Sequence, residues 1–204
     1  MIVIFQLFFT FSCCLIPFIS PRLVVFLRKI YYAQFAFLGT TVVFMGAILF
    51  KKRLLKTVPY NYIALGLYTV SETGSIVLFC VWFDILNVIF ALVAAIFTLV
   101  GLTLITCCTN SRPHYLLMVL IAVFFGSLPL GVLMIFFYPY YIGIASSVGI
   151  ISVMSIYIVY DVYIIMDKNQ LDYDDYVIGA LLLYMDMISM VIRLIQGNKQ
   201  EGGE

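Results

Sequence analysis

Two aspartates lie inside long apolar segments of the sequence. Asp161 belongs to the stretch 140–166 and Asp186 to the stretch 175–195. A carboxyl group within the hydrocarbon region of a bilayer is costly unless it is neutral, hydrated or paired, so an intramembrane acid indicates a functional site. Because the two acids fall on successive segments, we expect that they can share a proton.

The chemistry of such a pair depends on protons. Two neighbouring carboxyls in a low-dielectric environment cannot both ionise at low cost, so the pair holds one proton. With that proton it ties two helices by a carboxyl–carboxylate hydrogen bond; fully ionised, it repels itself and offers oxygen ligands to a hard cation such as Ca²⁺. The pattern therefore predicts a pH-sensitive latch, in which Asp161 and Asp186 are also transient Ca²⁺ ligands.

Glu72 is a third acid in the middle of an apolar run, 59–82. A purely structural role is the alternative for all three acids. An acid near a helix end can reach interfacial water, and a buried protonated acid can simply bond a neighbouring helix.

The composition sets the class of protein. Of 204 residues, 65% are apolar and 10% are charged, and the mean hydropathy is +1.16. Such a chain cannot form a water-soluble globule, so we interpret it as an integral membrane protein. Its 11 Lys and Arg nearly balance its 10 Asp and Glu, giving a net charge of +1, which gives no reason to expect nucleic acid as a partner.

Continuously apolar runs provide the elements that position these acids. Each is long enough for a hydrocarbon core of about 30 Å, and none shows the period-two alternation of a membrane barrel. The first run could instead be a signal peptide, although it lacks the basic start of one. We predict an all-α membrane protein with a single domain, 1–204, whose seven transmembrane helices span 2–19, 30–50, 59–82, 84–106, 114–137, 140–166 and 175–195.

The basic residues of the predicted loops indicate the orientation. Six fall on the side of the N-terminus and four on the other side, which favours a cytosolic N-terminus. If the last segment is re-entrant instead, Lys199 joins the larger group. In sequence order, the six are Lys51, Lys52, Arg53, Lys56, Arg112 and Lys168, and the four are Arg22, Arg28, Lys29 and Lys199.

Four stretches of the chain resemble those of one membrane protein family. The most specific combines an aspartate after a tyrosine, an acidic pair before Tyr176-Val177, and a second aspartate within a leucine-tyrosine-x-aspartate-x-isoleucine pattern. The stretches are Tyr160-Asp161 with Asp174-Asp175-Tyr176-Val177 and Leu183-Tyr184-Met185-Asp186-Met187-Ile188; Pro59-Tyr60-Asn61 to Glu72 with Phe83-Asp84; Gln6-Leu7 with Thr10; and the basic loop Lys51 to Lys56. In these residues the chain resembles the Bax-inhibitor-motif membrane protein family, in particular its Lifeguard and Golgi anti-apoptotic protein branch.

The resemblance implies a function. It implies a calcium-leak channel of the Golgi or endoplasmic reticulum membrane that is gated by protons and protects against apoptosis. Asp161 and Asp186 would be the latch, Glu72 an auxiliary pore acid, and the last helix the centre of a bundle of six others. The implied partners are membrane lipid, Ca²⁺ as permeant ion, protons and apoptosis-regulating membrane proteins, with no cofactor and no enzymatic activity.

This sequence departs from the family at two positions beside the aspartates. Val162 stands where the family usually has threonine, and Ser189 where it usually has asparagine. Both departures remove hydrogen-bonding capacity, so they bear on the tuning of the aspartate pair.

Two other classes of protein remain open. Intramembrane aspartyl proteases also place aspartates in a sixth and a seventh helix, with one acid ionised and one protonated. Their second aspartate follows a glycine-x-glycine, whereas Leu183-Tyr184-Met185 precedes Asp186 here, and their later proline-alanine-leucine is absent. A non-conducting membrane scaffold that regulates calcium channels or apoptosis partners is the other alternative, and its acids would be structural.

Overall fold

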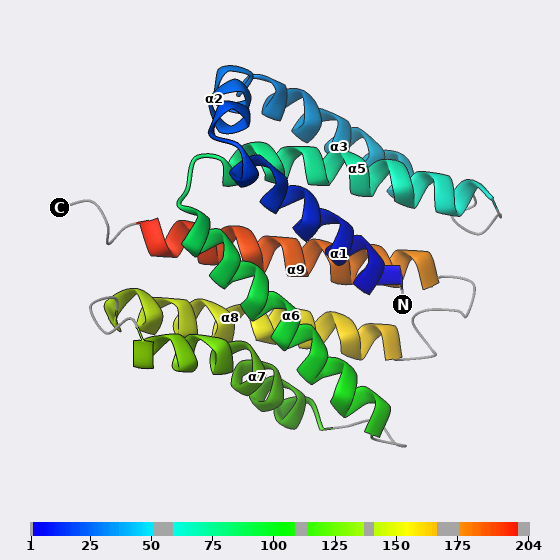
Figure 1. Ribbon diagram of the computed structural model, residues 1–204. Coiled ribbons are helices and arrows are strands. Elements are labelled where there is room, and N and C mark those ends of the chain that lie inside the picture. The colour runs from blue at the N-terminus through cyan, green and yellow to red at the C-terminus, as the bar shows by residue number, and fades with distance from the viewer. Residues whose placement is uncertain (1, 51–58, 109–113, 137–140, 167–175, 200–204) are drawn as a thin grey trace. The chain divides into compact units, whose positions relative to one another are not determined.

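The structure, a computed structural model, describes residues 2–50, 59–108, 114–136, 141–166 and 176–199. These residues form eight α-helices and one short 3-10 helix, with no strand among them, which confirms the all-α prediction for the described part (Figure 1). In chain order the elements are α1 (Ile2–Leu15), η1 (Ile16–Ile19), α2 (Pro21–Lys29), α3 (Ala33–Phe50), α5 (Tyr60–Cys80), α6 (Ile85–Cys108), α7 (Tyr115–Phe136), α8 (Tyr141–Met166) and α9 (Tyr176–Lys199).

Helix boundaries follow the predicted runs with small shifts. The break predicted at Asp84 is present, since α5 ends at Cys80 and α6 begins at Ile85. Helix α9 continues to Lys199, past the predicted end at 195, because backbone hydrogen bonding does not stop where the apolar residues stop. The loop predicted at 107–113 begins two residues later, since α6 runs to Cys108, and its remainder lies outside the described residues. The loops predicted at 51–58, 138–139 and 167–174, and the acidic pair Asp174-Asp175, also lie outside them.

The predicted first helix, 2–19, is divided by a proline. Helix α1 ends at Leu15 and the chain continues as the 3-10 helix η1, in which Pro17 is buried. Proline lacks a backbone N–H and clashes with the preceding helical turn, which disfavours continuation of the α-helix at this point. The local change to 3-10 geometry keeps the run helical to Ile19.

The break predicted between 2–19 and 30–50 is present, but its residues 21–29 form helix α2, so the prediction of a loop there is wrong. Pro21 lies in the first turn, where a missing N–H leaves no hydrogen bond unmade. Five consecutive apolar residues, 23–27, stand between Arg22 and Arg28-Lys29 in α2, and none of its residues is buried. A short amphipathic helix of this kind suits a membrane interface. Sequence reasoning took its basic residues as the mark of a loop.

Six helices are long and apolar enough to cross a membrane, judged by length and composition among the described residues. They are Ile2–Ile19, Tyr60–Cys80, Ile85–Cys108, Tyr115–Val132, Ser146–Met166 and Tyr176–Gly197. In α3 the described apolar part is shorter, Ala33–Gly46. The seven-helix count and the central position of the last helix are therefore not confirmed, while the reading as an integral membrane protein is supported.

The chain divides into two compact units, and the first holds α1 to α5 with α9 up to Tyr184. Helix α3 packs along α5 (Figure 1). The ring of Phe37 of α3 covers Gly74 of α5. Helix α2 is fixed to the end of α5. Its Arg28 donates from Nε and Nη2 to the carbonyl of Val81, at 3.1 and 2.9 Å, and lies 5.7 Å from the ring centroid of Trp82.

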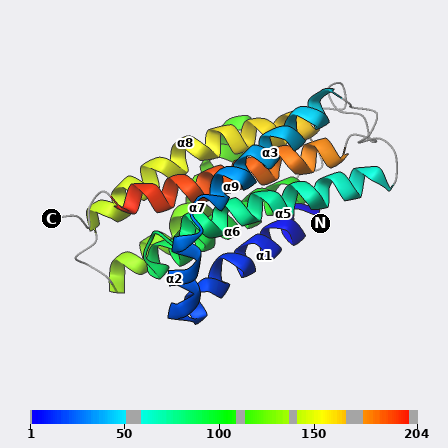
Figure 2. The same ribbon diagram turned by 90° about the horizontal axis from the view of Figure 1, so that it is seen from above.

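The second unit holds α6 from Leu86, α7, α8 and α9 from Met185. Helices α7 and α8 pack together, and Tyr115 donates from its hydroxyl to the carbonyl of Ile156 at 3.0 Å. The C-terminal half of α9 runs along α8 in both views (Figure 1, Figure 2). The two acids that the sequence singles out lie on these two helices.

Candidate functional site

Asp161 of α8 and Asp186 of α9 are brought together in the second unit. Both side chains are half-buried. The two carboxyls lie close enough to interact electrostatically, and the Oδ2 atom of Asp186 is buried without a hydrogen-bond partner. Two acids on successive helices of the second unit therefore lie near each other, and their role as a proton-sharing latch stays a prediction.

The antiparallel packing of α8 and α9 sets this juxtaposition. A Cβ atom added to Gly197 of α9 would meet the terminal methyl carbon of Ile150 of α8 at 2.5 Å, so this side chain reaches the backbone of α9 there. From this contact the aspartates lie about eleven residues, or three turns, along each helix. Fully buried residues such as Ile158 of α8 and Met190 of α9 lie between the contact of Ile150 with Gly197 and the aspartate pair. Apolar packing thus fixes the register that aligns the carboxyls.

The chemistry open to the pair is proton sharing or transient cation contact. Two carboxyl groups supply about four oxygen atoms, whereas Ca²⁺ takes about six to eight. Among the described residues, no group of three or more His, Cys, Asp or Glu side chains could hold a metal ion. The pair suits an ion that passes, with water completing its coordination, better than a resident metal.

Glu72 lies in the first unit, on α5. Its half-buried carboxyl lies near the hydroxyl of Thr41 of α3 and near the phenol groups of Tyr68 and Tyr184. Glu72 therefore has polar neighbours inside the first unit. The role of an auxiliary pore acid stays a prediction.

A buried polar network in the first unit joins residues that sequence reasoning did not assign to a site. Gln6 Nε2 donates to Thr69 Oγ1 at 2.6 Å. Four residues further along each helix, the hydroxyls of Thr10 and Thr73 lie 2.9 Å apart, and Thr10 also contacts the hydroxyl of Tyr184 at 2.8 Å. Helices α1 and α5 therefore run parallel, with α9 completing the network. The repeat of polar residues four apart on both helices was the signal that could have predicted it.

Replacement of Thr10 by valine tests how much this network stabilises the protein. Valine keeps the shape of threonine but leaves the hydroxyls of Thr73 and Tyr184 with fewer partners. We expect the free energy of unfolding to fall by about 1 kcal/mol, because side-chain hydrogen bonds between membrane helices contribute about this much. Unfolding of the purified protein by SDS in mixed micelles, followed by circular dichroism, measures the change.

The control for this prediction is Thr103→Val. Thr103 is exposed on α6 and donates only to the carbonyl of Leu99 in its own helix, at 2.8 Å. Its replacement should change the free energy of unfolding by less than about 0.5 kcal/mol. Equal losses for the two variants would contradict a stabilising role of the network between helices.

One family model matches the chain. Its description is "Inhibitor of apoptosis-promoting Bax1", and the match covers residues 1–200. No curated protein and no solved structure matches the sequence. The matched range includes both aspartates, Glu72 and every residue of the buried polar network.

Proposed function

Because this match extends over nearly its whole length, the chain belongs to the Bax inhibitor family, and on that premise we propose that it is a pH-sensitive calcium-leak channel of internal membranes. Family membership supports an anti-apoptotic membrane protein at the level of the family. Calcium conduction, gating by Asp161 and Asp186 and residence in the Golgi or endoplasmic reticulum are the parts that we add.

The single observation that carries the proposal is the pairing of the two aspartates across α8 and α9. When the pair holds a proton, its hydrogen bond ties the second half of α9 to α8. When the second proton leaves, two negative charges face each other in a medium of low dielectric constant and repel strongly. Loss of the proton therefore loosens α9 and exposes carboxylate oxygens to a cation, so that calcium flux rises with pH.

The sign of the pH dependence follows from the same argument. At low pH the protonated pair is closed, and the closed state is lost as the pH rises through the titration of the pair. Each unit of pH changes the ratio of protonated to ionised pairs about tenfold. The reverse dependence, with flux rising as the pH falls, would contradict a latch that is closed by its proton.

Calcium flux through the purified protein tests the proposal directly. The protein is reconstituted into liposomes that contain a calcium indicator, and Ca²⁺ entry is measured between about pH 5 and pH 8. We expect entry above that of protein-free liposomes, with an increase of roughly tenfold across the range. The absence of flux at every pH would exclude the channel and leave a non-conducting scaffold, the second candidate from the sequence, as the function to test.

A further inference from the structure

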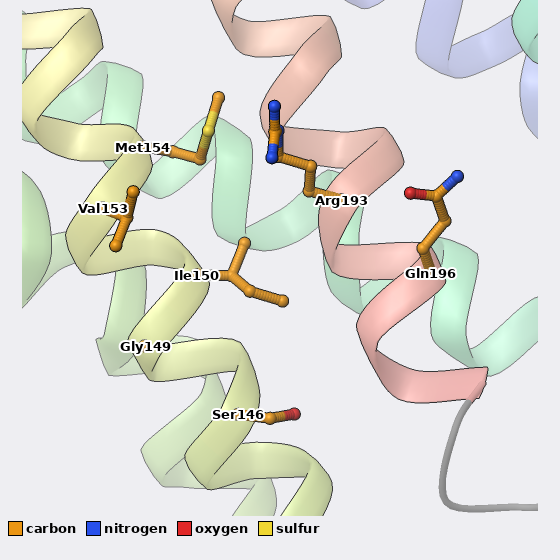
Figure 3. A pocket seen from close by; sticks show the side chains of 7 residues that line it. All are labelled: Ser146, Gly149, Ile150, Val153, Met154, Arg193 and Gln196. Atoms are coloured by element: carbon orange, nitrogen blue, oxygen red, sulfur yellow. The ribbon is translucent and has the colours of Figure 1, made fainter.

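A groove of about 450 Å³ lies between α8 and the last turns of α9, within the second unit. Its α8 wall is formed by Ser146, Gly149, Ile150, Val153 and Met154, and its α9 wall by Arg193 and Gln196 (Figure 3). Most of this lining is apolar, with one cationic side chain at its edge. The groove is separate from the aspartate pair, since Arg193 follows Asp186 by about two helical turns.

Arg193 is the unusual member of this lining. It lies within the span Tyr176–Gly197, and its side chain is exposed. Among the described residues no acidic side chain forms an ion pair with it, and Asp186, the nearest acid along α9, faces Asp161 instead. A guanidinium in a membrane span requires an anion or water, and the end of α9 lies only about 9 Å beyond it. An anion at the level of the lipid headgroups would meet this requirement.

The shape and the apolar lining of the groove indicate which chemical group is attached to the anion that Arg193 binds. The side chain of Arg193 extends between the two helices toward Met154, and Ile150 points from α8 toward α9 (Figure 3). Gly149 has no side chain, and a Cβ atom added to it would meet nothing within 4 Å, so this part of the wall is open. A groove that is mostly apolar and has a guanidinium at its edge fits an alkyl chain attached to an anionic headgroup. A free phosphate ion would leave the apolar wall uncovered.

We propose that this groove binds one anionic phospholipid. The lipid phosphate accepts hydrogen bonds from Arg193 and Gln196, and one acyl chain lies along Gly149, Ile150 and Val153. The guanidinium supplies paired donors that match phosphate oxygens, which gives preference for a net negative headgroup. The bound lipid bridges α8 and α9 on the other side of the Ile158 and Met190 level from the aspartate pair.

Binding of defined lipids to the purified full-length protein tests the proposal. The protein is held in a neutral detergent and titrated with phosphatidylglycerol or with phosphatidylcholine, and bound lipid is counted by native mass spectrometry. We expect one phosphatidylglycerol to be retained with roughly tenfold higher affinity than phosphatidylcholine. Equal affinity for the two lipids would overturn the assignment. Inorganic phosphate should not displace the lipid, and displacement at a similar concentration would mean that the site takes a free anion.

Two variants test the two halves of the site independently. Arg193→Gln removes the charge and should weaken phosphatidylglycerol binding roughly tenfold, whereas Gly149→Leu keeps the charge and fills the apolar wall, and should weaken binding similarly. Arg22→Gln and Gly66→Leu are the matched controls, because Arg22 is an exposed arginine on α2 and Gly66 an exposed helical glycine with open space around it. Unchanged binding in both groove variants, or equal losses in the controls, would overturn the proposal.

Discussion

The Asp186→Asn variant should conduct Ca²⁺ at a low rate that no longer changes with pH. An asparagine amide donates a hydrogen bond to the Asp161 carboxylate whether or not protons are available, so it holds α9 against α8 at every pH. The wild-type pair loses this bond when it ionises. At the upper end of the pH range the variant should therefore conduct roughly tenfold less than the wild type, and at the lower end the two should agree.

This result is measured in the same assay of Ca²⁺ entry into indicator-containing liposomes, with Asp84→Asn as the control. Asp84 is an exposed carboxyl between α5 and α6, so its replacement removes the same charge away from the pair. The control should keep the pH dependence of the wild type. Asp161→Asn should behave like Asp186→Asn, because either amide can replace the shared proton. A pH dependence that persists unchanged in the Asp186→Asn variant would exclude the latch.

The helices could be predicted from the sequence because hydropathy alone reports where a bilayer can be crossed. Runs such as 140–166 and 175–195 appear as α8 and α9 with shifts of a few residues. The short helix α2 could not be predicted in this way. Its basic residues lower the hydropathy, and only their helical spacing around Val25 and Phe26 distinguishes an amphipathic helix from a loop.

The aspartate pair was predicted as a pair, yet its geometry depends on packing that hydropathy does not contain. Rotating α9 by half a turn would leave its composition unchanged and would turn Asp186 away from α8. The rotation depends on which side chains meet at the contact, such as Ile150 of α8 against Gly197 of α9. The polar network of Thr10, Thr73 and Tyr184 could not be predicted for a related reason. The free-energy cost of a neutral hydroxyl in a membrane helix is small, so its presence does not indicate a site as a carboxyl does.

Replacement of Gly126 by leucine should strongly destabilise the protein, because three helices meet at this glycine in the second unit. A Cβ atom on Gly126 of α7 would lie against the hydroxyl of Thr98 on α6 and 2.9 Å from a methyl carbon of Ile151 on α8. Both neighbours are fully buried, and Thr98 is further held by a 2.9 Å hydrogen bond to the carbonyl of Ala94. A β-branched side chain held in this way cannot move aside without separating the helices.

We expect Gly126→Leu to lower the free energy of unfolding by about 2–3 kcal/mol, as overpacking of a close-packed interior does. Gly131→Leu is the control on the same helix, since Gly131 is exposed and an added Cβ meets nothing within 4 Å; its change should stay within about 0.5 kcal/mol. SDS-induced unfolding measures both variants. If the contact with Thr98 is the cause, adding Thr98→Ala should restore part of the loss, because the two positions are coupled. Strictly additive losses would show that the strain arises elsewhere.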